Sequence, residues 1–273
     1  SQNKWSIKKQ LIIRIQTACN PRRSWEVLEK IEGMIIKTQD YGETNRLITI
    51  FSGKLGKFSA IAKGAKKPKS RMAAVTQPFI LGHYLVYVTK GLSNVQQGEV
   101  INSFRPIRED IVKTAYASYL AELVDKLLES KTVEPYIYDQ FIKTMEWIQD
   151  HEAIDIPIMM FELKLYGKAG FAPIVNHCVQ CGEKNQLAAF SVTHGGVLCS
   201  RCKHIDDRRI ELVPSLIRLL QIFANVGIDQ IGNISVKEEN VQKLRMLLDL
   251  YYDQYGGFYL KTRKFLKSLD AFK

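Results

Sequence analysis

Apolar and polar positions alternate in short runs between residues 33 and 102, as they do in half-buried β-strands. Glycines separate the runs. The Gly53–Gly56 link has the length of a hairpin turn, and Gly82 is expected to bend the fourth run. Five strands in about 75 residues are typical of an OB-type β-barrel. We therefore predict strands over Gly33–Thr38, Arg46–Phe51, Lys57–Ala62, Phe79–Thr89 and Leu92–Asn102.

After residue 105 the apolar period lengthens to that of an amphipathic helix. The clearest stripe contains Ile111, Ala115, Leu123 and Leu127, which fall on one helical face. A Gly256-Gly257 pair is expected to end one helix, and a short basic helix follows it. We predict helices over residues 108–128, 136–149, 157–168, 214–224, 237–255 and 258–267.

Four cysteines form two CxxC pairs that are separated by 17 residues. Each CxxC turn presents two thiolates to one ion, and four thiolates suit the tetrahedral coordination of Zn²⁺. The segment between the pairs contains two short apolar runs, 187–192 and 194–198, which predict two strands and a turn. Because sulfur fills all four positions, the predicted zinc is structural and not catalytic. The predicted ligands are Cys178, Cys181, Cys199 and Cys202.

Two alternatives stay open for the cysteines. The thiols are free or form a redox pair, or one of the flanking histidines, His177 and His204, competes with a sulfur for the metal. Four sulfurs already satisfy the ion, which favours the all-cysteine site.

The predicted elements place the chain in the α+β class. An N-terminal five-stranded OB-type β-barrel is followed by an α-helical domain that carries an inserted four-cysteine zinc module. The predicted domains are residues 27–104 for the OB-fold, 105–173 plus 206–273 for the helical domain, and 174–205 for the zinc module. Residues 1–26 show no matching pattern, so we expect a non-native or disordered extension, with Val27 as the natural start.

Charge changes this picture, because the net charge is +11 and the isoelectric point is near 9.3. Such a balance favours an anionic partner. The window from Thr44 to Gly98 contains no Asp and no Glu, whereas acids and bases are mixed elsewhere. We predict that this window binds a nucleic-acid backbone; the alternative is a solvated surface with lysines spaced by chance. The candidate DNA-binding residues are Arg46, Lys54, Lys57, Lys63, Lys66, Lys67, Lys69 and Arg71.

Binding of a single strand also requires flat side chains on which bases stack. The candidates are Tyr41, Phe58, Tyr84 and Tyr87, although barrel-core packing is the commoner role for each. Further cations that suit phosphate or an acidic partner, with a solvated face as the alternative, are Arg201, Lys203, Lys261, Arg263, Lys264 and Lys267.

The sequence gives little support for an enzyme. The acids Glu122, Asp125 and Glu129 alternate with lysine and predict a solvated helix face, and there is no GxxxxGK[ST] phosphate loop. Apolar grooves between the helices are predicted to dock a partner's peptide. Two other functions stay open: an RNA- or ribosome-binding protein with an OB-fold and a zinc ribbon, and a zinc-containing nucleic-acid enzyme.

Several segments resemble the bacterial recombination mediator RecO family, in particular its Gram-positive members. They include Asp40–Asn45, Ala62–Arg71, Gln77–Phe79, Asn176–Cys181 and Tyr259–Thr262. The resemblance extends in order from about residue 27 to residue 272. It implies the same three-part architecture. The four cysteines match the family residue by residue, whereas the individual DNA contacts are our own inference.

In function, the resemblance implies binding of single- and double-stranded DNA and annealing of complementary strands. It also implies that the protein, together with RecR, loads RecA on DNA coated by single-strand binding protein. The acidic tail of single-strand binding protein is a further implied partner. The expected location is the cytoplasm, in association with the nucleoid, and no membrane partner is expected because no run of about 18 apolar residues occurs.

Overall fold

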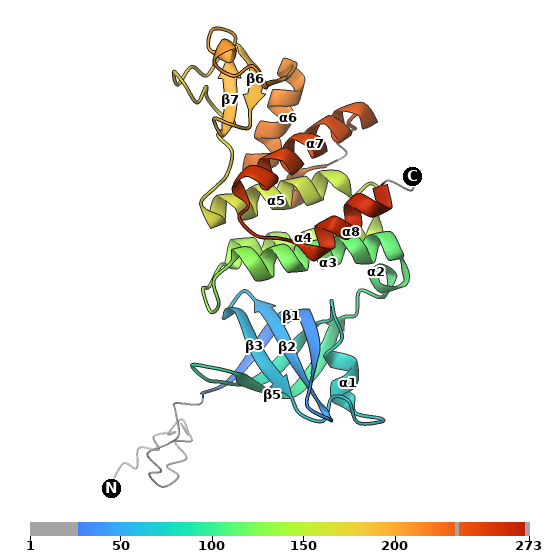
Figure 1. Ribbon diagram of the computed structural model, residues 1–273. Coiled ribbons are helices and arrows are strands. Elements are labelled where there is room, and N and C mark those ends of the chain that lie inside the picture. Colours follow the sequence, from blue (N-terminus) through green and yellow to red (C-terminus); the bar gives the residue numbers. More distant parts are fainter. Residues whose placement is uncertain (1–26, 233–234, 271–273) are drawn as a thin grey trace, which may run out of the picture.

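The computed structural model describes residues 27–232 and 235–270, with side chains up to residue 268. Figure 1 shows a β-barrel at one end, a stack of helices in the middle and a small sheet at the other end. The predicted extension, residues 1–26, lies outside the described residues. No helix in the described ranges is long and apolar enough to cross a membrane.

The barrel closes in the strand order β1-β2-β3-β5-β4. All neighbours pair antiparallel except β3 and β5, which run parallel. This closed five-stranded arrangement confirms the predicted OB-type architecture. Its core holds Ile50, Phe58, Tyr84 and Val86. The strands are β1 (Val27–Tyr41), β2 (Asn45–Ser52), β3 (Gly56–Ala62), β4 (Leu81–Val88) and β5 (Ser93–Asn102).

Strand β1 is much longer than the predicted Gly33–Thr38. Its first half pairs with β4 and its second half pairs with β2. A register shift between Ile35 and Lys37 lies where the strand changes partner. The charged Glu29 and Lys30 interrupt the apolar pattern, so the sequence did not predict a strand in the first half.

Gly82 marks an irregularity in β4, as predicted, because the pairing of β4 with β5 shifts register beside it. A Cβ atom at this position would lie 2.5 Å from the backbone oxygen of Glu99, so the two strands approach too closely for a side chain. A short helix, α1 (Arg71–Val75), precedes β4 and was not predicted. Its Val75 is buried in the barrel core.

The predicted helices are present, with one division. The first predicted helix, residues 108–128, is interrupted at Asp110, whose carboxylate accepts a hydrogen bond from the backbone N–H of Lys113 at 2.8 Å and caps the second piece. The helices are α2 (Arg105–Glu109), α3 (Ile111–Leu127), α4 (Pro135–Asp150), α5 (Asp155–Ala169), α6 (Pro214–Asn225), α7 (Glu238–Tyr255) and α8 (Lys261–Asp270), with 3₁₀ turns η1 (Lys203–Ile205) and η2 (Ile228–Gln230).

The small sheet belongs to the cysteine module, residues 174–205. Its strands β6 (Leu187–Ser191) and β7 (Gly196–Cys199) confirm the predicted pair, and β8 (Ile210–Glu211) adds a third strand from beyond the module. Phe190 of β6 packs edge-on against Tyr251 of α7, with 5.9 Å between the ring centroids. The module therefore shares one apolar core with the helices, and the barrel interior forms a second core. Met34, Phe51 and Leu81 of the barrel pack into the helical core.

The loop between α3 and α4 holds the barrel against the helices. The Lys131 ammonium donates to the backbone carbonyls of residues 89–91, and its backbone N–H donates to the oxygen of Lys57 at 2.7 Å. A Cβ atom at Gly56 would lie 2.1 Å from the oxygen of Thr132. This close contact covers the end of the barrel that holds the β2–β3 turn.

Candidate metal centre and nucleic-acid surface

The four predicted ligands converge in the cysteine module. The sulfur atoms of Cys178, Cys181, Cys199 and Cys202 all lie within 4.8 Å of one another. The Gly182 N–H donates to the Cys178 oxygen at 2.9 Å, and the Cys202 N–H donates to the Cys199 oxygen at 3.0 Å, so each CxxC segment is a tight turn. Among the described residues this metal-binding group contains neither His177 nor His204.

The chemistry of this cluster fits a metal ion. The Cys181 and Cys199 sulfurs are 3.7 Å apart, which is too far for a disulfide bond. Burial raises the pKa of the Cys178 thiol, but backbone N–H groups that point at its sulfur outweigh this effect and bring the pKa down to about 6. Four clustered sulfurs, with a preference for thiolate at Cys178, are the donor set of a tetrahedral Zn²⁺ site.

The module is fixed to the rest of the chain by polar contacts as well as by packing. The Ser191 hydroxyl donates to the Asp206 carboxylate, and this hydrogen bond is the main cause that lowers the pKa of Asp206. The Tyr255 hydroxyl donates to the Val192 oxygen at 2.9 Å. A metal ion here would therefore stabilise a sheet that rests on α7.

The basic loop, residues 63–71, lies at the end of the barrel that is remote from the helices, beside α1 (Figure 1). Gly64 has a φ of +67°, a conformation that favours glycine, and its N–H donates to the Asn45 side chain at 2.9 Å. The Lys66 N–H donates to the Thr44 oxygen at 2.9 Å. These bonds hold the basic loop beside the β1–β2 turn.

Four of the eight candidate DNA-binding residues remain available on this loop. Each has an exposed side chain, and no carboxylate in the described ranges forms an ion pair with it. We call Lys63, Lys67, Lys69 and Arg71 the loop cations. Their charge is directed to solvent from one short segment, as a phosphate-binding surface requires.

Two candidates lie at the opposite end of β3 and do not join the loop cations. Lys57 is buried: its ammonium donates to the backbone oxygen of Asp125 and lies 3.6 Å from the carboxylate of the same residue. Burial lowers the pKa of Lys57. Lys54 forms an ion pair with Glu29 at 2.6 Å. The placement of Lys57 in a solvent-facing site was therefore wrong, because a buried ammonium cannot contact a phosphate.

The remaining two candidates lie near the loop but have partners within the barrel. The Arg46 guanidinium donates to the Ala73 oxygen at 3.1 Å and helps to hold α1. The Lys66 ammonium lies 2.8 Å from the Asp40 carboxylate and lowers the pKa of that acid. The acid-free window is thus partly neutralised by acids from outside it.

The four aromatic candidates divide in the same way. Phe58 and Tyr84 are fully buried, and the Tyr84 hydroxyl donates to the Val75 oxygen at 2.9 Å. Tyr41 is 45% exposed, and it pairs with Asn45 across the turn beside the basic loop. Tyr87 is also exposed, but it lies towards the far end of β4. Tyr41 is therefore the aromatic ring best placed to act with the loop cations.

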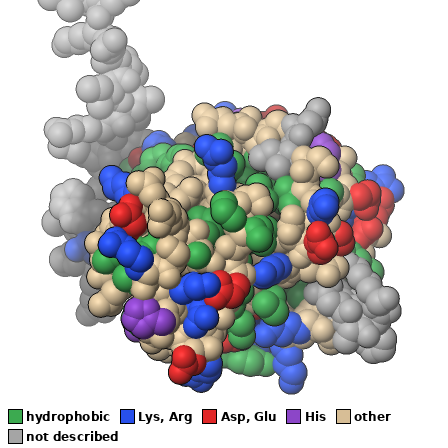
Figure 2. All heavy atoms as spheres, turned by 90° about the horizontal axis from the view of Figure 1, so that it is seen from above, with side chains coloured by type: hydrophobic (Ala, Val, Ile, Leu, Met, Phe, Trp, Pro, Cys, Tyr) green, Lys and Arg blue, Asp and Glu red, His purple; other side chains and the backbone are tan. Residues whose placement is uncertain are grey.

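The outer face of the cysteine module carries mixed charge. Figure 2 views the molecule from this end, and Lys and Arg side chains alternate there with Asp and Glu. Arg201 lies 3.7 Å from Glu183, and Lys203 lies 3.0 Å from Glu211. These pairs neutralise the module's candidate cations.

Two acids of α3 have defined roles that the alternation of charges concealed. Glu122 accepts hydrogen bonds from the backbone N–H groups of Lys261 and Thr262, at 3.2 and 2.9 Å, and so caps the start of α8. Asp125 binds Lys37 at 3.2 Å and also neutralises the buried Lys57. The prediction of a simple solvated face was wrong for these two residues. Contacts over such sequence separations leave no local signal.

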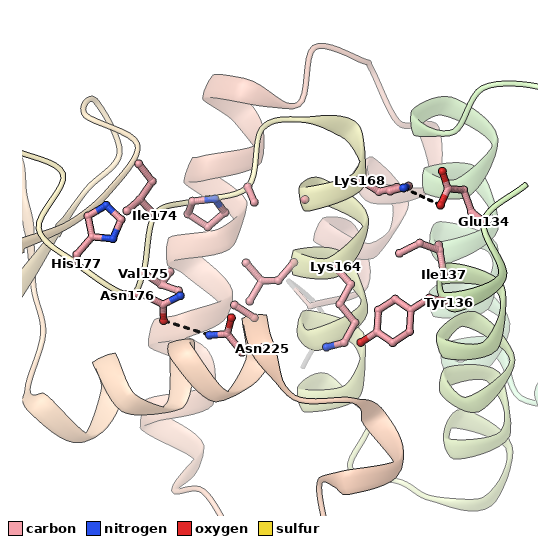
Figure 3. Close-up of a pocket in the computed structure, with 15 residues that line it drawn as sticks. Glu134, Tyr136, Ile137, Lys164, Lys168, Ile174, Val175, Asn176, His177 and Asn225 are labelled. Atoms are coloured by element: carbon pink, nitrogen blue, oxygen red, sulfur yellow. Dashed lines mark hydrogen bonds and ion pairs between the residues drawn. The ribbon is translucent and has the colours of Figure 1, made fainter. Parts of the chain in front are cut away.

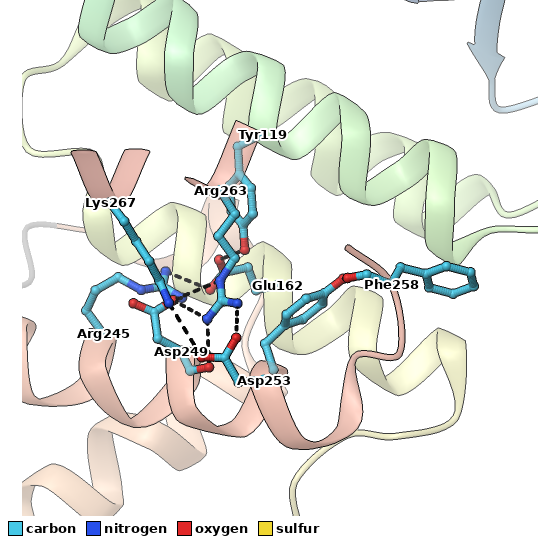
Figure 4. A network of polar contacts seen from close by, with 9 residues as sticks. Tyr119, Glu162, Arg245, Asp249, Asp253, Phe258, Arg263 and Lys267 are labelled. Carbon is cyan, nitrogen blue, oxygen red and sulfur yellow. Dashed lines mark hydrogen bonds and ion pairs between the residues drawn. The ribbon is translucent and has the colours of Figure 1, made fainter. Parts of the chain in front are cut away.

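A buried ion-pair network crosses the helical domain (Figure 4). Glu162 has no exposed surface, accepts a hydrogen bond from the Tyr119 hydroxyl and lies 2.8 Å from the Arg245 guanidinium. Burial raises the pKa of Glu162, against the opposing pull of Arg245. Asp249 continues the network to Arg263 of α8 at 3.2 Å. The network joins α3, α5, α7 and α8.

A pocket of about 560 Å³ lies between α4, α5 and α6 (Figure 3). Apolar side chains line most of it, and Lys168 and Glu134 form an ion pair of 2.8 Å at its rim. Lys164 also lines the pocket; its ammonium donates to the Phe223 oxygen at 3.1 Å, and burial lowers its pKa to about 8. This is an apolar groove of the kind predicted between the helices; the docking of a peptide in it stays a prediction.

Two family models match the chain in succession. The model described as Recombination protein O N terminal matches residues 27–104, which contain the barrel. The model described as Recombination protein O C terminal matches residues 108–264, which contain helices α3 to α7 and the cysteine module.

Curated proteins show the same relationship over most of the chain. A DNA repair protein RecO of Oceanobacillus iheyensis is 58% identical over 246 residues, which cover 90% of this chain and 95% of that protein. Proteins of the same name from Bacillus cereus and Bacillus anthracis are each 42% identical over 247 residues, which cover 90% of this chain and 100% of theirs. With both halves matched and identity at this level, the chain belongs to the RecO family.

Proposed function

We propose that this protein acts in recombinational DNA repair as a DNA-binding mediator that anneals complementary strands and helps to load RecA on single-stranded DNA coated by single-strand binding protein. The names of its relatives support the first part of this proposal. The observation that carries the proposal is the set of loop cations, four positive charges that have no ion-pair partner in the described part of the chain and stand on one loop beside the exposed ring of Tyr41.

The proposed mechanism rests on charge neutralisation. Two DNA strands repel each other because each carries a dense row of phosphates. A cationic surface that releases counterions from one strand lowers the local repulsion, so a second strand can approach and complementary bases can pair. Stacking on Tyr41 would hold bases apart from their neighbours, with their pairing edges accessible.

We further propose that the protein has no catalytic activity of its own. Zinc, held by the four cysteines, would stabilise the cysteine module as a structural ion. Four sulfur ligands leave no position for a reactive water, and Glu162, a carboxylate with no exposed surface, is engaged in a buried ion-pair network. Annealing needs no nucleotide, because pairing of the strands is itself favourable.

The proposed partners are DNA, RecR, single-strand binding protein and, through them, RecA. An acidic tail needs an apolar groove that contains a cation. The pocket of Figure 3 has apolar walls, and Lys168 lies at its rim, where it pairs with Glu134. A carboxylate of the tail would take the place of Glu134 beside Lys168. We propose this pocket as the docking site for such a tail.

The test of the proposed function is an annealing assay without nucleotide. Complementary oligonucleotides, coated with single-strand binding protein, should pair faster when the pure protein is added. A variant in which Lys63, Lys67 and Lys69 are changed to Glu should lose this effect. Equal annealing rates with and without the protein would contradict the proposal, as would preferential binding of RNA in competition with single-stranded DNA.

A further inference from the structure

Three large aromatic side chains are exposed around the start of α8. Tyr259 is 68% exposed, Phe258 is 50% exposed and Phe265 is 46% exposed. Single apolar residues on a surface are ordinary, but a group of aromatic rings on one turn and the helix that follows it marks an interaction site. This group lies on the helical domain, whereas the loop cations lie on the barrel (Figure 1).

Cations alternate with these rings along the chain. Lys261 and Lys264 are exposed, and no carboxylate in the described part of the chain forms an ion pair with either. A groove of about 490 Å³ follows the turn and is lined by Phe258, Tyr259 and Lys264 among others. Its charged lining groups are Arg263, Lys264, Lys267 and Asp253. Because Arg263 and Lys267 both pair with Asp253, Lys264 is the lining cation that stays available to an anion among the described residues.

The inner face of α8 is fixed, which leaves its outer face free to bind. The carboxylate of Glu122 caps the start of the helix, and Leu260 and Leu266 are buried against the domain. The Arg263 guanidinium lies between the α7 acids and 4.9 Å from the centre of the Tyr252 ring. Figure 4 shows the Phe258 ring pointing away from this ion-pair cluster.

We propose that the α7–α8 turn and the outer face of α8 form a second binding site for single-stranded nucleic acid, separate from the loop cations. Lysines alone would suit any anion. Exposed aromatic rings that alternate with lysines also supply surfaces on which successive bases stack, and this combination is the one that single-strand binders use. The choice of polyanion rests on the proposed function. The site extends that function, because one molecule would then contact DNA on the barrel and on the helical domain.

The sharpest test compares variants of Tyr259, whose side chain is the most exposed of the three rings. Tyr259→Ala should weaken binding of an oligo-dT strand about fivefold or more, as measured by fluorescence anisotropy, because one stacking contact is lost. Tyr259→Phe keeps the ring and should bind like the unmodified protein. A structural role is checked by thermal unfolding, which both variants should leave unchanged because the side chain is largely in solvent.

Charge is tested separately with Lys264→Glu. This change should weaken binding of the strand and reduce the slope of log K against log salt by about one. The matched control is Lys237→Glu. Lys237 is also exposed, but it precedes the other end of α7, about 27 Å along the helix axis. The control should bind almost normally. Equal losses for the two variants would overturn the site, since only net charge would then matter.

The outcome can be separated from that of the proposed function. Suppose that Tyr259→Ala and Lys264→Glu both bind DNA like the unmodified protein, while the variant with three altered loop cations loses binding. This result would overturn the second site and leave the proposal for the loop cations intact. Photocrosslinking of a bromouracil-substituted strand to residues 258–265 would support the inference. If these substitutions weaken the binding of an acidic peptide but not the binding of DNA, the inference is overturned in favour of a protein partner.

Discussion

The two ends of the barrel contain lysines from the same acid-free stretch of sequence, yet they use them differently. At the end remote from the helices, the loop cations face solvent without ion-pair partners among the described residues. At the end that meets the helices, Lys57 is buried against Asp125, and Lys54 binds Glu29. The first set is available to a polyanion, and the second set supports the structure.

This difference shows that a run of positive charge in a sequence is not the same as positive charge on a surface. Asp125 lies 68 residues from Lys57 along the chain, and α3 brings them together. This contact is one of those that join the barrel to the helical domain. Loss of charge should therefore affect different properties at the two ends: DNA binding at the loop cations, and stability at Lys57.

The largest expected effect comes from the proposed metal site. It lies outside the barrel, so a change there sets the scale against which the two ends of the barrel are compared. Cys199→Ser removes a buried sulfur from the proposed zinc site, and it should lower the unfolding free energy by about 5 kcal/mol, because metal binding contributes directly to the folding of such modules. The expected fall in melting temperature is about 10–20 °C. Zinc content and thermal unfolding measure the result. An unchanged melting temperature in a zinc-free variant would contradict a structural ion.

The next effect concerns the loop cations. Combined Lys63→Glu, Lys67→Glu and Lys69→Glu should weaken DNA binding about 100-fold and reduce the slope of log K against log salt by about 2 for a single strand. The melting temperature should stay the same, because these side chains are exposed and unpaired among the described residues. Binding titrations at several salt concentrations test this expectation. An unaltered slope would remove the loop from the site.

A smaller effect, on stability alone, is expected at the other end of the barrel. Lys57→Met keeps most of the length of the buried side chain but removes its charge, and it should cost about 2 kcal/mol because Asp125 loses a partner. The affinity for DNA should not change. Urea unfolding and the binding titration are measured on the same sample. A loss of affinity without a loss of stability would reverse the assignment of the two ends.

The smallest effect is expected at the border between the two sets. Asp40→Asn releases Lys66 from its ion pair, and it should strengthen DNA binding about two- to fivefold at low salt, with no gain at high salt. Glu109→Gln, which removes an exposed acid paired with Arg105 on α2, is a matched control for the change in net charge. An equal gain in the control would show that Lys66 is not part of the surface.

Local sequence patterns predicted most of the fold. Alternation marked the barrel strands, the 3.6-residue period marked the helices, and the CxxC spacing marked the sulfur cluster. The pattern failed where neighbouring residues have different surroundings. Glu29 and Lys30 concealed half of β1, and the cap at Asp110 divided a helix that looked continuous. In both cases polar side chains have roles that their immediate neighbours in the sequence do not signal.

The sequence by itself determined the three-part architecture, the cluster of four sulfurs and the presence of excess positive charge, because each depends on spacing or composition within a short segment. Only the tertiary structure decided which cations and which rings are accessible. Burial of Lys57, the cap that Glu122 provides for α8 and the exposure of Tyr259 all depend on how distant segments pack. Ion pairs and burial depend on which residues are neighbours in space, and this cannot be inferred from the order of residues along the chain.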